Sequence, residues 1–258
     1  MSENESAGGT VQSLVRGLAV LRAFDGPEAL SAADVARRAE IPRAAAARFL
    51  RTLAELGYVR ADANGRFQLT PRVLEFGNGY LSGLSLPEIV QPHLDDLSHR
   101  VGESASVAVL DGADIVYVAR AAARRIMSVH ITIGTRLPAY ATSMGRVLLA
   151  ALSPDEAQSV LRATPAAPLT DLTTVDPGDL VRILAETRTN GFAEVEGELE
   201  EGVRSFAVPL HGRAGTVAAL NVSMSTARGT QAEARERLLP ELRITAAAID
   251  AELVASGV

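Results

Sequence analysis

Hydrophobic residues recur at spacings of three and four along the first sixty residues, and this period predicts three amphipathic helices. Each predicted helix has one apolar stripe and one polar or charged face, as expected of helices that pack around a small common core. The predicted helices cover residues 11–24, 31–40 and 42–57.

Local signals place the ends of the second and third helices. Ser31 and Asp34 have the spacing of a capping box at a helix start. The second helix should stop near Glu40, because the residue before Pro42 is pushed out of the helical region. Pro42 then opens the third helix, and Gly57 supplies a left-handed stop. Two helices joined by so short a break must cross steeply, as in a helix-turn-helix.

The hydrophobic pattern changes to a period of two after the third helix. A strand begins at Tyr58, and Phe67 and Leu69 alternate with polar neighbours on a return strand. Residues 64–65 between them are Asn-Gly, the preferred two-residue hairpin turn. The hairpin predicts a wing, and residues 10–70 are therefore predicted to form a winged helix-turn-helix domain that binds double-stranded DNA.

The face of the third helix opposite its apolar stripe carries small or cationic side chains. Such a face leaves room for close approach to the phosphate-lined groove of duplex DNA. A small helical domain with a solvated arginine face is the alternative interpretation. The residues on this face are Arg43, Ala44, Ala47, Arg48 and Arg51.

The rest of the chain mixes helices and strands. Residues 71–85 are predicted to form a linker helix, and residues 86–256 a second domain. The order of hairpins and crossovers favours an α+β fold, with an antiparallel-dominated sheet and helices on its faces. The expected helices are 86–101, 143–151, 154–162, 177–189 and 231–254; the expected strands are 104–110, 115–120, 127–133, 192–196, 205–210 and 216–223.

Composition narrows the class of protein. The chain has 258 residues, enough for about two domains, and 47% of them are hydrophobic. We expect no membrane span and no signal peptide, and hence a cytoplasmic protein. Without cysteine there are no disulfides or thiolate ligands, and the four histidines lack metal-ligand spacing, so neither a metal nor a cofactor is predicted.

Charge divides unevenly along the chain. Between residues 10 and 70 there are nine arginines and six acidic residues, a net charge of +3, whereas the whole chain carries −6 and the remainder therefore −9. A cationic module attached to an acidic body confines contact with nucleic acid to that module.

A candidate ligand site lies where a strand runs directly into a helix, at residues 137–145. A helix start presents free backbone N–H groups, which attract anions, and Thr142 and Ser143 add hydroxyl groups. Apolar walls at the same place suit a small carboxylic acid with a hydrophobic body, and polar residues on the last strand can close the pocket. An ordinary capped helix is the alternative. The wall residues are Ile126, Val129, Leu137 and Met144, and the closing residues Asn221 and Ser223.

The same segment contains part of a hydrolase motif. Gly145 follows Ser143 as in a nucleophile elbow, but Ala141 stands where the first glycine of G-x-S-x-G belongs. His130 and the acidic run at residues 194–201 do not amount to a triad, because such runs are typical of solvated edges and loops. No catalytic residue is predicted, although the acidic run is expected near the pocket rim.

Three stretches together resemble the IclR family of bacterial transcriptional regulators over nearly the whole chain. They are residues 16–21 with the helix-turn-helix behind them, residues 137–150, and residues 202–209 leading to residues 218–223. The chain is most similar to the subgroup that governs aromatic-acid and β-ketoadipate catabolism, including protocatechuate and p-hydroxybenzoate regulators. This resemblance implies an effector similar to protocatechuate, hydroxybenzoate or oxoadipate.

The resemblance also implies an architecture and a set of contacts. It implies a winged N-terminal domain, a linker helix and a GAF-like effector domain, in subunits paired through their DNA-binding halves and often as dimers of dimers. The residues assigned to effector binding are Ile126, Val129, Leu137, Tyr140, Thr142, Ser143, Met144, Gly145, Ser205, Asn221 and Ser223. The residues assigned to DNA binding are Arg16, Ser31, Arg43, Ala44, Ala45, Ala47, Arg48, Arg51, Thr52 and Arg66.

The chain departs from the family at the start of the third helix. The family usually has serine or threonine after its Pro-x, whereas residues 44–46 here are alanines. Base reading through hydroxyl groups is therefore in doubt, which leaves Arg43, Arg48 and Arg51, with alanine methyl contacts to thymine as a supplement.

The leading hypothesis is a dimeric or tetrameric regulator whose operator binding is modulated by a small organic acid, aromatic or dicarboxylic. An enzyme that converts a small acid and uses its helix-turn-helix only to oligomerise is the alternative. A DNA-bound structural protein without an effector is the third hypothesis. A ligand-induced rise in melting temperature separates the first from the third.

Overall fold

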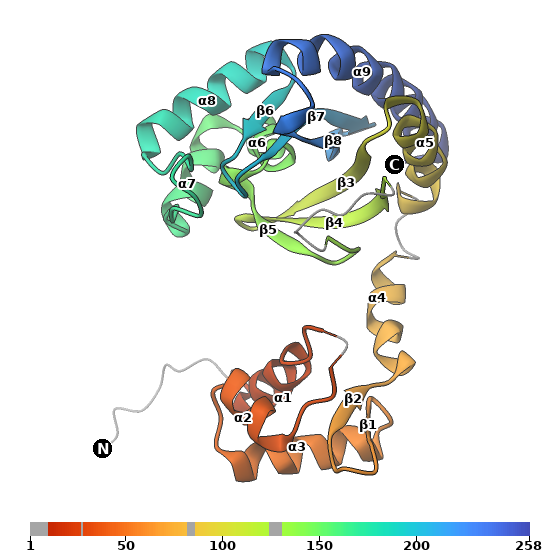
Figure 1. Cartoon of the computed structure of the whole chain (residues 1–258), viewed down its shortest axis with the longest axis vertical. Helices are drawn as coiled ribbons and strands as arrows, with labels where there is room; N and C mark the ends of the chain where they lie inside the picture. The colour runs from red at the N-terminus through yellow and green to blue at the C-terminus, as the bar shows by residue number, and fades with distance from the viewer. Residues whose placement is uncertain (1–9, 27, 82–85, 124–130) are drawn as a thin grey trace, which may run out of the picture. The chain divides into compact units, whose positions relative to one another are not determined.

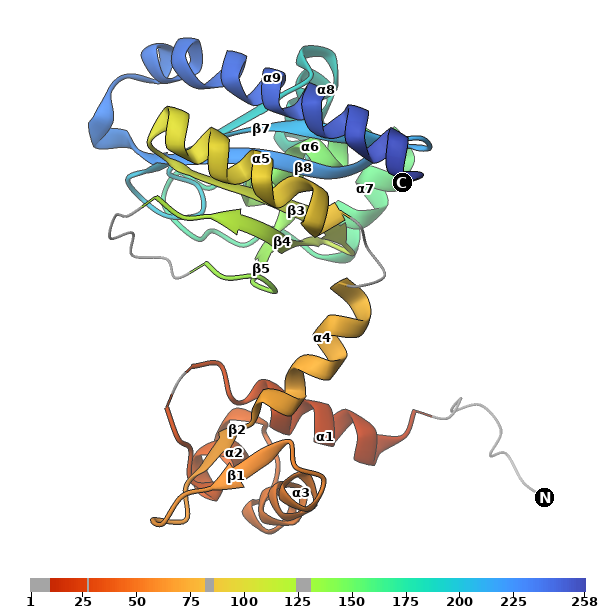
Figure 2. The ribbon, with the colours of Figure 1, turned by 90° about the vertical axis from the view of Figure 1, so that its right-hand side faces the viewer.

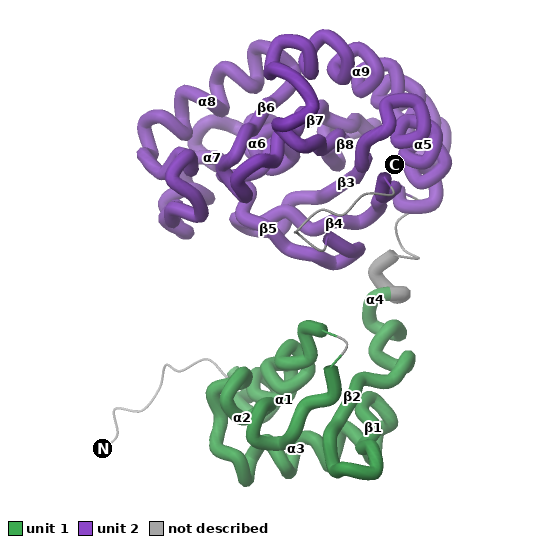
Figure 3. The backbone as a smooth tube through the Cα atoms, in the orientation of Figure 1, with its two compact units in different colours: residues 1–82 green, residues 83–258 purple. Residues whose placement is uncertain are grey.

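The computed structural model describes residues 10–26, 28–81, 86–123 and 131–258. Contacts divide the chain into two compact units, residues 1–82 and residues 83–258 (Figure 3). The described part of the first unit contains four α-helices and a hairpin, and the second unit contains a sheet covered by helices on both faces (Figure 1).

Three helices of the first unit enclose a small core. They are α1 (Gln12–Arg22), α2 (Ala32–Arg38) and α3 (Arg43–Glu55). The capping box predicted at the start of α2 is present, because Ser31 and Asp34 bond to each other's backbone. Val20, Val35 and Leu50 are completely buried where the three helices meet. The predicted apolar stripes therefore do face one another.

The turn between α2 and α3 is closed by backbone hydrogen bonds. The N–H of Ile41 donates to the carbonyl of Ala36 at 3.0 Å, which places Glu40 in the left-handed region at φ 53°. Glycine is the residue that usually occupies this position, because a side chain there is crowded. At the other end of α3 a glycine does so, since Gly57 has φ 81°.

A hairpin follows α3 and forms the predicted wing. Strands β1 (Val59–Ala61) and β2 (Phe67–Leu69) pair in antiparallel register, and Leu30 adds a bridge to Phe67. The 3-10 turn η1 (Pro71–Val73) and helix α4 (Leu74–Leu81) come next. Arg72 links this segment to the wing domain by donating to the Leu56 carbonyl at 2.8 Å.

The second unit contains one antiparallel sheet of six strands in the order β5-β4-β3-β8-β7-β6. Its edges are short, which limits pairing with other chains. The strands are β3 (Ser104–Asp111), β4 (Asp114–Ala121), β5 (Arg136–Pro138), β6 (Ala193–Glu196), β7 (Val203–Gly212) and β8 (Gly215–Ser225). The predicted α+β fold with an antiparallel sheet is confirmed.

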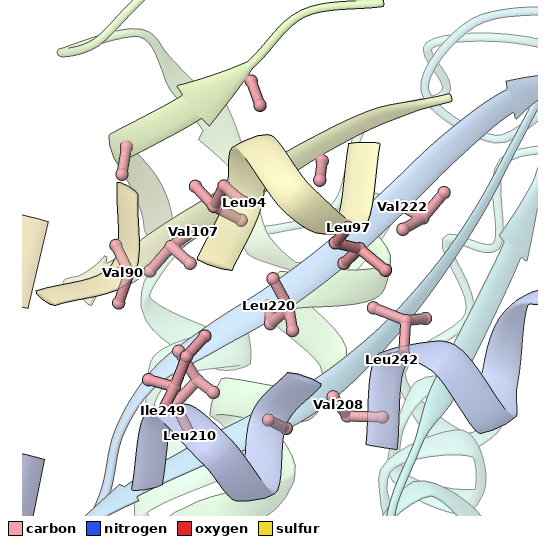
Figure 4. Packing of buried hydrophobic residues seen from close by; sticks show 14 of the residues in the cluster. Val90, Leu94, Leu97, Val107, Val208, Leu210, Leu220, Val222, Leu242 and Ile249 are labelled. Atoms are coloured by element: carbon pink, nitrogen blue, oxygen red, sulfur yellow. The ribbon is translucent and has the colours of Figure 1, made fainter. Parts of the chain in front are cut away.

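Two long helices cover one face of the sheet. They are α5 (Leu86–Val101) and α9 (Gln231–Ser256), which lie beside each other across the strands (Figure 2). Their buried leucines and isoleucine interdigitate with strand side chains such as Leu220 in the larger core of this unit (Figure 4). Leu94 and Leu97 of α5 and Leu242 and Ile249 of α9 are fully buried, in agreement with the predicted periodicity.

Three further helices cover the opposite face of the sheet. They are α6 (Ser143–Ala151), α7 (Pro154–Ala163) and α8 (Pro177–Asn190), and the 3-10 turn η2 (Ala139–Ala141) leads into α6. α6 is central to this layer, because every residue from Ser143 to Ala150 is buried. A cavity on this side of the sheet therefore has the strands as one wall and α6 as the other.

One predicted strand is wrong in the part that the structure describes. Residues 131–133 are not in a strand, and residues 127–130 lie outside the described residues. A turn takes their place, because Thr135 Oγ1 accepts from the N–H of Thr132 at 2.9 Å and Gly134 adopts φ 87°. The strand instead begins at Arg136.

Candidate functional site

The first candidate surface is the exposed side of α3. Ala44, Arg48 and Arg51 are exposed and lie on one side of the helix, while Ala46 and Leu50 are buried on the other. Thr52 and Arg43 are also exposed, and Ala45 and Ala47 are half-buried at the borders of this side. The helix therefore offers a shallow surface edged by guanidinium groups.

The arginines of the first unit fall into two groups. Arg37 pairs with Asp34 at 2.9 Å, and Arg38 pairs with Asp25, so these two stabilise the fold. The side chains of the second group, to which Arg22 and Arg60 also belong, form no ion pair or hydrogen bond with any residue in the described part of the chain. This group contains the five arginines predicted to contact DNA, namely Arg16, Arg43, Arg48, Arg51 and Arg66, all of which are exposed.

Ser31 has a structural role that its assignment to DNA contact did not include. Its hydroxyl donates to Asp34 at 2.7 Å and accepts from the Asp34 backbone N–H at 3.2 Å. These hydrogen bonds lower the pKa of the Asp34 carboxyl from its ordinary value of 3.8. The Ser31 hydroxyl thus already donates one hydrogen bond and accepts another at the start of α2.

The second candidate site is a cavity in the second unit, between the sheet and the start of α6. Its volume is about 40 Å³. Six of the residues predicted to bind an effector line it, namely Thr142, Ser143, Met144, Ser205, Asn221 and Ser223. Two segments that are far apart in the sequence, residues 142–144 and 205–223, are therefore brought together at one place.

Two polar atoms of this cavity are buried without a hydrogen-bond partner in the described structure. They are Ser143 Oγ, on a residue that is 1% exposed, and Asn221 Oδ1, on a residue that is 3% exposed. The amide nitrogen of Asn221 does have a partner, since it donates to Ser223 Oγ at 3.0 Å. A buried polar group without a partner is costly, so such atoms indicate a place that another molecule completes.

The start of α6 is less open than the sequence suggested. Thr142 Oγ1 accepts from the Gly145 N–H at 3.1 Å, and the Thr142 N–H donates to the Ala139 carbonyl at 3.4 Å. Two of the backbone N–H groups predicted to attract an anion are therefore occupied. The hydroxyl of Ser143, by contrast, is available to a ligand.

Three residues assigned to effector binding are not among those that line the cavity. Leu137 packs at the edge of the apolar core, and the Tyr140 hydroxyl donates to the Ala167 carbonyl at 2.7 Å. Gly145 allows close packing, because a Cβ there would lie 2.2 Å from the Ala139 carbonyl oxygen. Ile126 and Val129 lie outside the described residues.

Residues that the sequence analysis did not assign also line the cavity. Tyr117 and Arg120 come from β4, and Glu198 comes from the acidic run that was expected near the rim. Burial raises the pKa of the Tyr117 phenol to about 12, and burial lowers the pKa of Arg120 from its ordinary value of 12.5. Alternation along β4 gives no signal for this pair, because residues three apart in a regular strand face opposite sides.

A buried ion pair braces one side of the cavity. Arg146 on α6 donates to Glu198 at 2.6 Å, and both side chains are nearly enclosed, at 4% and 10% exposed. The same carboxylate oxygen accepts from the backbone N–H of Thr174 at 2.8 Å, and Arg146 Nε donates to the Tyr140 carbonyl at 2.9 Å. The charge of Glu198 is thus neutralised by protein groups.

Among the described residues, no cluster of three or more histidine, aspartate or glutamate side chains is arranged to hold a metal ion. Within the same residues, no helix is both long and apolar enough to span a membrane.

Comparisons with known proteins cover both units. A model of the IclR helix-turn-helix domain matches residues 13–63. A model of the C-terminal domain of the bacterial transcriptional regulator IclR matches residues 78–251. The candidate α3 surface lies within the first match and the cavity within the second.

Individual relatives agree with these matches. The chain is 44% identical to the Pca regulon regulatory protein of Pseudomonas putida over 233 residues, which cover 89% of this chain and 80% of that protein. It is 35% identical to the p-hydroxybenzoate hydroxylase transcriptional activator of Acinetobacter baylyi over 92% of this chain and 89% of that one. The crystal structure of an IclR homolog from Microbacterium hydrocarbonoxydans, complexed with 4-hydroxybenzoate, superposes with a TM-score of 0.81 at 27% identity, covering 93% of this chain and 98% of that one.

Proposed function

Because the chain belongs to the IclR family of bacterial transcriptional regulators, we propose that it binds a specific operator through α3 and that a small organic acid in the cavity modulates this binding. Its relatives are named transcriptional regulators, so the protein is a regulator and not an enzyme. The observation that carries the effector half of the proposal is the pair of buried atoms without partners, Ser143 Oγ and Asn221 Oδ1.

The unpaired arginines support operator binding. A guanidinium that has no carboxylate partner is free to neutralise a phosphate or to bond a guanine edge. Arg48 and Arg51 lie one turn apart on the open side of α3, where the neighbouring alanine lets the helix approach the duplex closely. Arg66 at the wing is positioned for backbone contact beside the helix.

The cavity supports an acid with an apolar body. Met144 and Ile131 provide apolar wall, Arg120 provides a cation, and Ser143 and Asn221 provide uncompensated polar atoms. An aromatic acid is the favoured class, since a relative binds 4-hydroxybenzoate, and a dicarboxylic acid remains the alternative. Benzene fills an engineered cavity of about 150 Å³, so an aromatic ring requires the walls of this cavity to move apart.

Exposed apolar residues on α1 support pairing of subunits. Val11, Leu14, Val15 and Leu18 recur at helical spacing and are each 47% to 61% exposed. A stripe of this kind is expected to be covered by another protein surface, and a second copy of the same helix provides a matching one. We therefore expect a dimer, and a dimer of dimers where half-sites are repeated. The protein is expected to act in the cytoplasm, where operators are accessible.

A combined melting and gel-shift experiment tests this function. Full-length protein is heated with and without 4-hydroxybenzoate, protocatechuate and adipate at about 100 times the dissociation constant, where binding stabilises the protein by about 2.7 kcal/mol. The acid that raises the melting temperature should also change affinity for the operator. If no acid shifts the melting temperature, the effector proposal fails; if no promoter fragment outcompetes bulk DNA, the operator proposal fails.

A further inference from the structure

We infer that Arg120 binds the carboxylate of the effector and that Asn221 and Ser143 bind a hydroxyl group at its other end, so that the cavity selects a hydroxy-substituted acid. This inference rests on the proposed effector function and specifies how the ligand is oriented. It is carried by the register of β4 and by the hydrogen-bonding state of the cavity atoms.

A bulge in β4 brings the cation to the cavity. Val107 on β3 faces Ala119, but the next residue, Ala108, faces Tyr117, so Val118 has no opposite residue. Val118 and Ala119 consequently both pack in the core beneath α5 and α9. After this extra residue the alternation resumes one step out of phase, and Tyr117 and Arg120 both line the cavity.

Arg120 has no carboxylate partner among the residues that the structure describes. Its guanidinium donates from Nη1 to Ser106 Oγ at 3.2 Å, and the side chain is half-buried. A guanidinium remains charged when buried, so it requires a counter-charge to offset its lost hydration. A ligand carboxylate meets this need with two parallel hydrogen bonds.

Glu198, which together with Glu200 is one of the two carboxylates that line the cavity, does not meet that need. Glu198 is paired with Arg146 and also accepts from the Thr174 backbone. Tyr117 adds to the attraction for an acid instead, because a phenol whose pKa is about 12 stays protonated and can donate a hydrogen bond. The end of the cavity next to β4 therefore offers a charge and a donor to an incoming anion.

The other end of the cavity, at Asn221 and Ser143, needs a hydrogen-bond donor from the ligand. One N–H of Asn221 Nδ2 donates to Ser223 Oγ, whereas the acceptor Oδ1 of the same amide is buried without a partner. A carboxylate has no proton to donate to it, whereas a hydroxyl group does. Ser143 Oγ, also without a partner, can donate to the oxygen of the same hydroxyl group or accept from a second one.

The residues at the two ends of the cavity lie in one row across the sheet. Arg120 lies opposite Ser106, and Ser106 lies opposite Asn221, so the three residues form one row across β4, β3 and β8. The outer two are two strand spacings apart, or roughly 10 Å between backbones. Ser106 lies between them, and the Arg120 guanidinium reaches over it to donate to Ser106 Oγ at 3.2 Å. A ring therefore fits between the two ends only when the Arg120 side chain moves off Ser106, as part of the wall movement that an aromatic acid requires.

Three probes that differ by one group each test the orientation in the full-length protein. They are 4-hydroxybenzoate, benzoate, which lacks the hydroxyl, and 4-hydroxybenzamide, which lacks the charge. We expect the wild-type protein to bind 4-hydroxybenzoate at least about 10-fold more tightly than benzoate and about 100-fold more tightly than the amide, by calorimetry. If the wild-type protein binds all three equally, the inference is wrong.

Two variants assign these preferences to residues. Arg120→Met should weaken 4-hydroxybenzoate about 100-fold while changing 4-hydroxybenzamide less than about threefold, and Arg120→Lys should recover part of the loss. Asn221→Leu should remove the preference for 4-hydroxybenzoate over benzoate. Arg182→Met is the matched control, because Arg182 is 60% exposed on α8 and does not line the cavity.

The outcomes separate this inference from the proposed function. If the wild-type protein binds none of the three probes, the aromatic-acid effector is wrong and this orientation falls with it. If Arg120→Met binds 4-hydroxybenzoate as the wild type does, the orientation is wrong and the effector proposal stands. Unchanged operator binding and far-ultraviolet circular dichroism show that each variant is folded; should Arg120→Met not fold, the three wild-type affinities and Arg120→Lys still decide.

Discussion

The two units present their recognition groups in opposite ways. In the first unit the five arginines predicted to contact DNA are exposed and unpaired within the described structure, and they lie on elements whose own core is complete without them. In the second unit the corresponding groups are buried, and Ser143 and Asn221 each retain an atom without a partner. A large charged partner such as DNA can be met at a surface, whereas a small ligand is bound tightly only if it is enclosed.

This difference determines how each unit compensates its charges. An exposed arginine is solvated by water, so removing it alters DNA contact and leaves folding almost unchanged. A buried arginine depends on a protein partner, as Arg146 depends on Glu198. Substitutions in the two units should therefore separate loss of binding from loss of stability.

The largest expected effect is on the stability of the second unit. Arg146→Met leaves the Glu198 carboxylate buried without its counter-charge, which should lower the free energy of unfolding by about 3–5 kcal/mol. Urea denaturation followed by circular dichroism measures the change, and Arg146→Met combined with Glu198→Leu should regain much of it. A loss below about 1 kcal/mol in the single variant would show that the pair is solvated.

The next effect is on DNA binding by the first unit. Arg48→Ala should weaken operator binding by about 1–3 kcal/mol and relax base preference if Arg48 reads a guanine, whereas a phosphate contact would weaken all sequences alike. A competition gel shift with scrambled operators distinguishes the two roles. Arg37→Ala is the control, because Arg37 is paired with Asp34. Equal binding by wild type and Arg48→Ala would remove Arg48 from the interface.

A smaller effect is expected at the turn between α2 and α3. Glu40 occupies the left-handed region at φ 53°, which glycine adopts without crowding, so Glu40→Gly should raise the free energy of unfolding by up to about 1 kcal/mol. Arg51→Gly, at an exposed position inside α3, should lower it by about 1 kcal/mol. Thermal melts measure both variants against the wild type. A change of the same sign in both melting temperatures would contradict the explanation that the left-handed backbone at Glu40 favours glycine.

The smallest effect concerns pH. Hydrogen bonds to Ser31, Ser153 and Thr230 lower the pKa values of the capping carboxylates Asp34, Glu156 and Glu233 below their ordinary values of 3.8, 4.5 and 4.5. A lowered folded pKa stabilises the protein above the ordinary value, and this contribution is lost as the pH falls through the folded pKa. Stability should therefore decline with acid below about pH 4.5, and Ser153→Ala should reduce the slope. Identical slopes for Ser153→Ala and wild type would exclude the Glu156 cap as a contributor.

Much of the first unit was predictable because its signals are local. The capping box at Ser31 and the proline before α3 each act over a few residues, and each lies where it was expected. The wing hairpin is also present, but its predicted two-residue Asn-Gly turn is wrong: residues 63–65 form a three-residue loop closed by Asp62 and Arg66, in which Gly65 alone has a positive φ of 70°. The open side of α3 follows from helical periodicity alone. The sequence was enough to place the arginines on that side. It could not show that their side chains lack ion-pair partners, because that depends on the tertiary structure.

The cavity was predictable only in part. The residues of the α6 start and of β8 were identified, but Leu137, Tyr140 and Gly145 have packing or hydrogen-bonding roles beside the cavity rather than on its lining. The strand expected over residues 127–133 was wrong at residues 131–133, because a turn closed by Thr132 and Thr135 precedes β5. Short apolar alternation does not reveal such a turn.

The sequence by itself determined the order of the elements, the helix ends and the division between a cationic first unit and an acidic remainder, because caps, periodicity and charge are properties of neighbouring residues. Tertiary structure alone decided which side chains share the cavity. The bulge at Val118 reverses the facing of Arg120, and strand pairing brings Ser106 and Asn221 beside it from distant parts of the chain. Register between strands depends on packing of both sheet faces at once, and no local pattern specifies it.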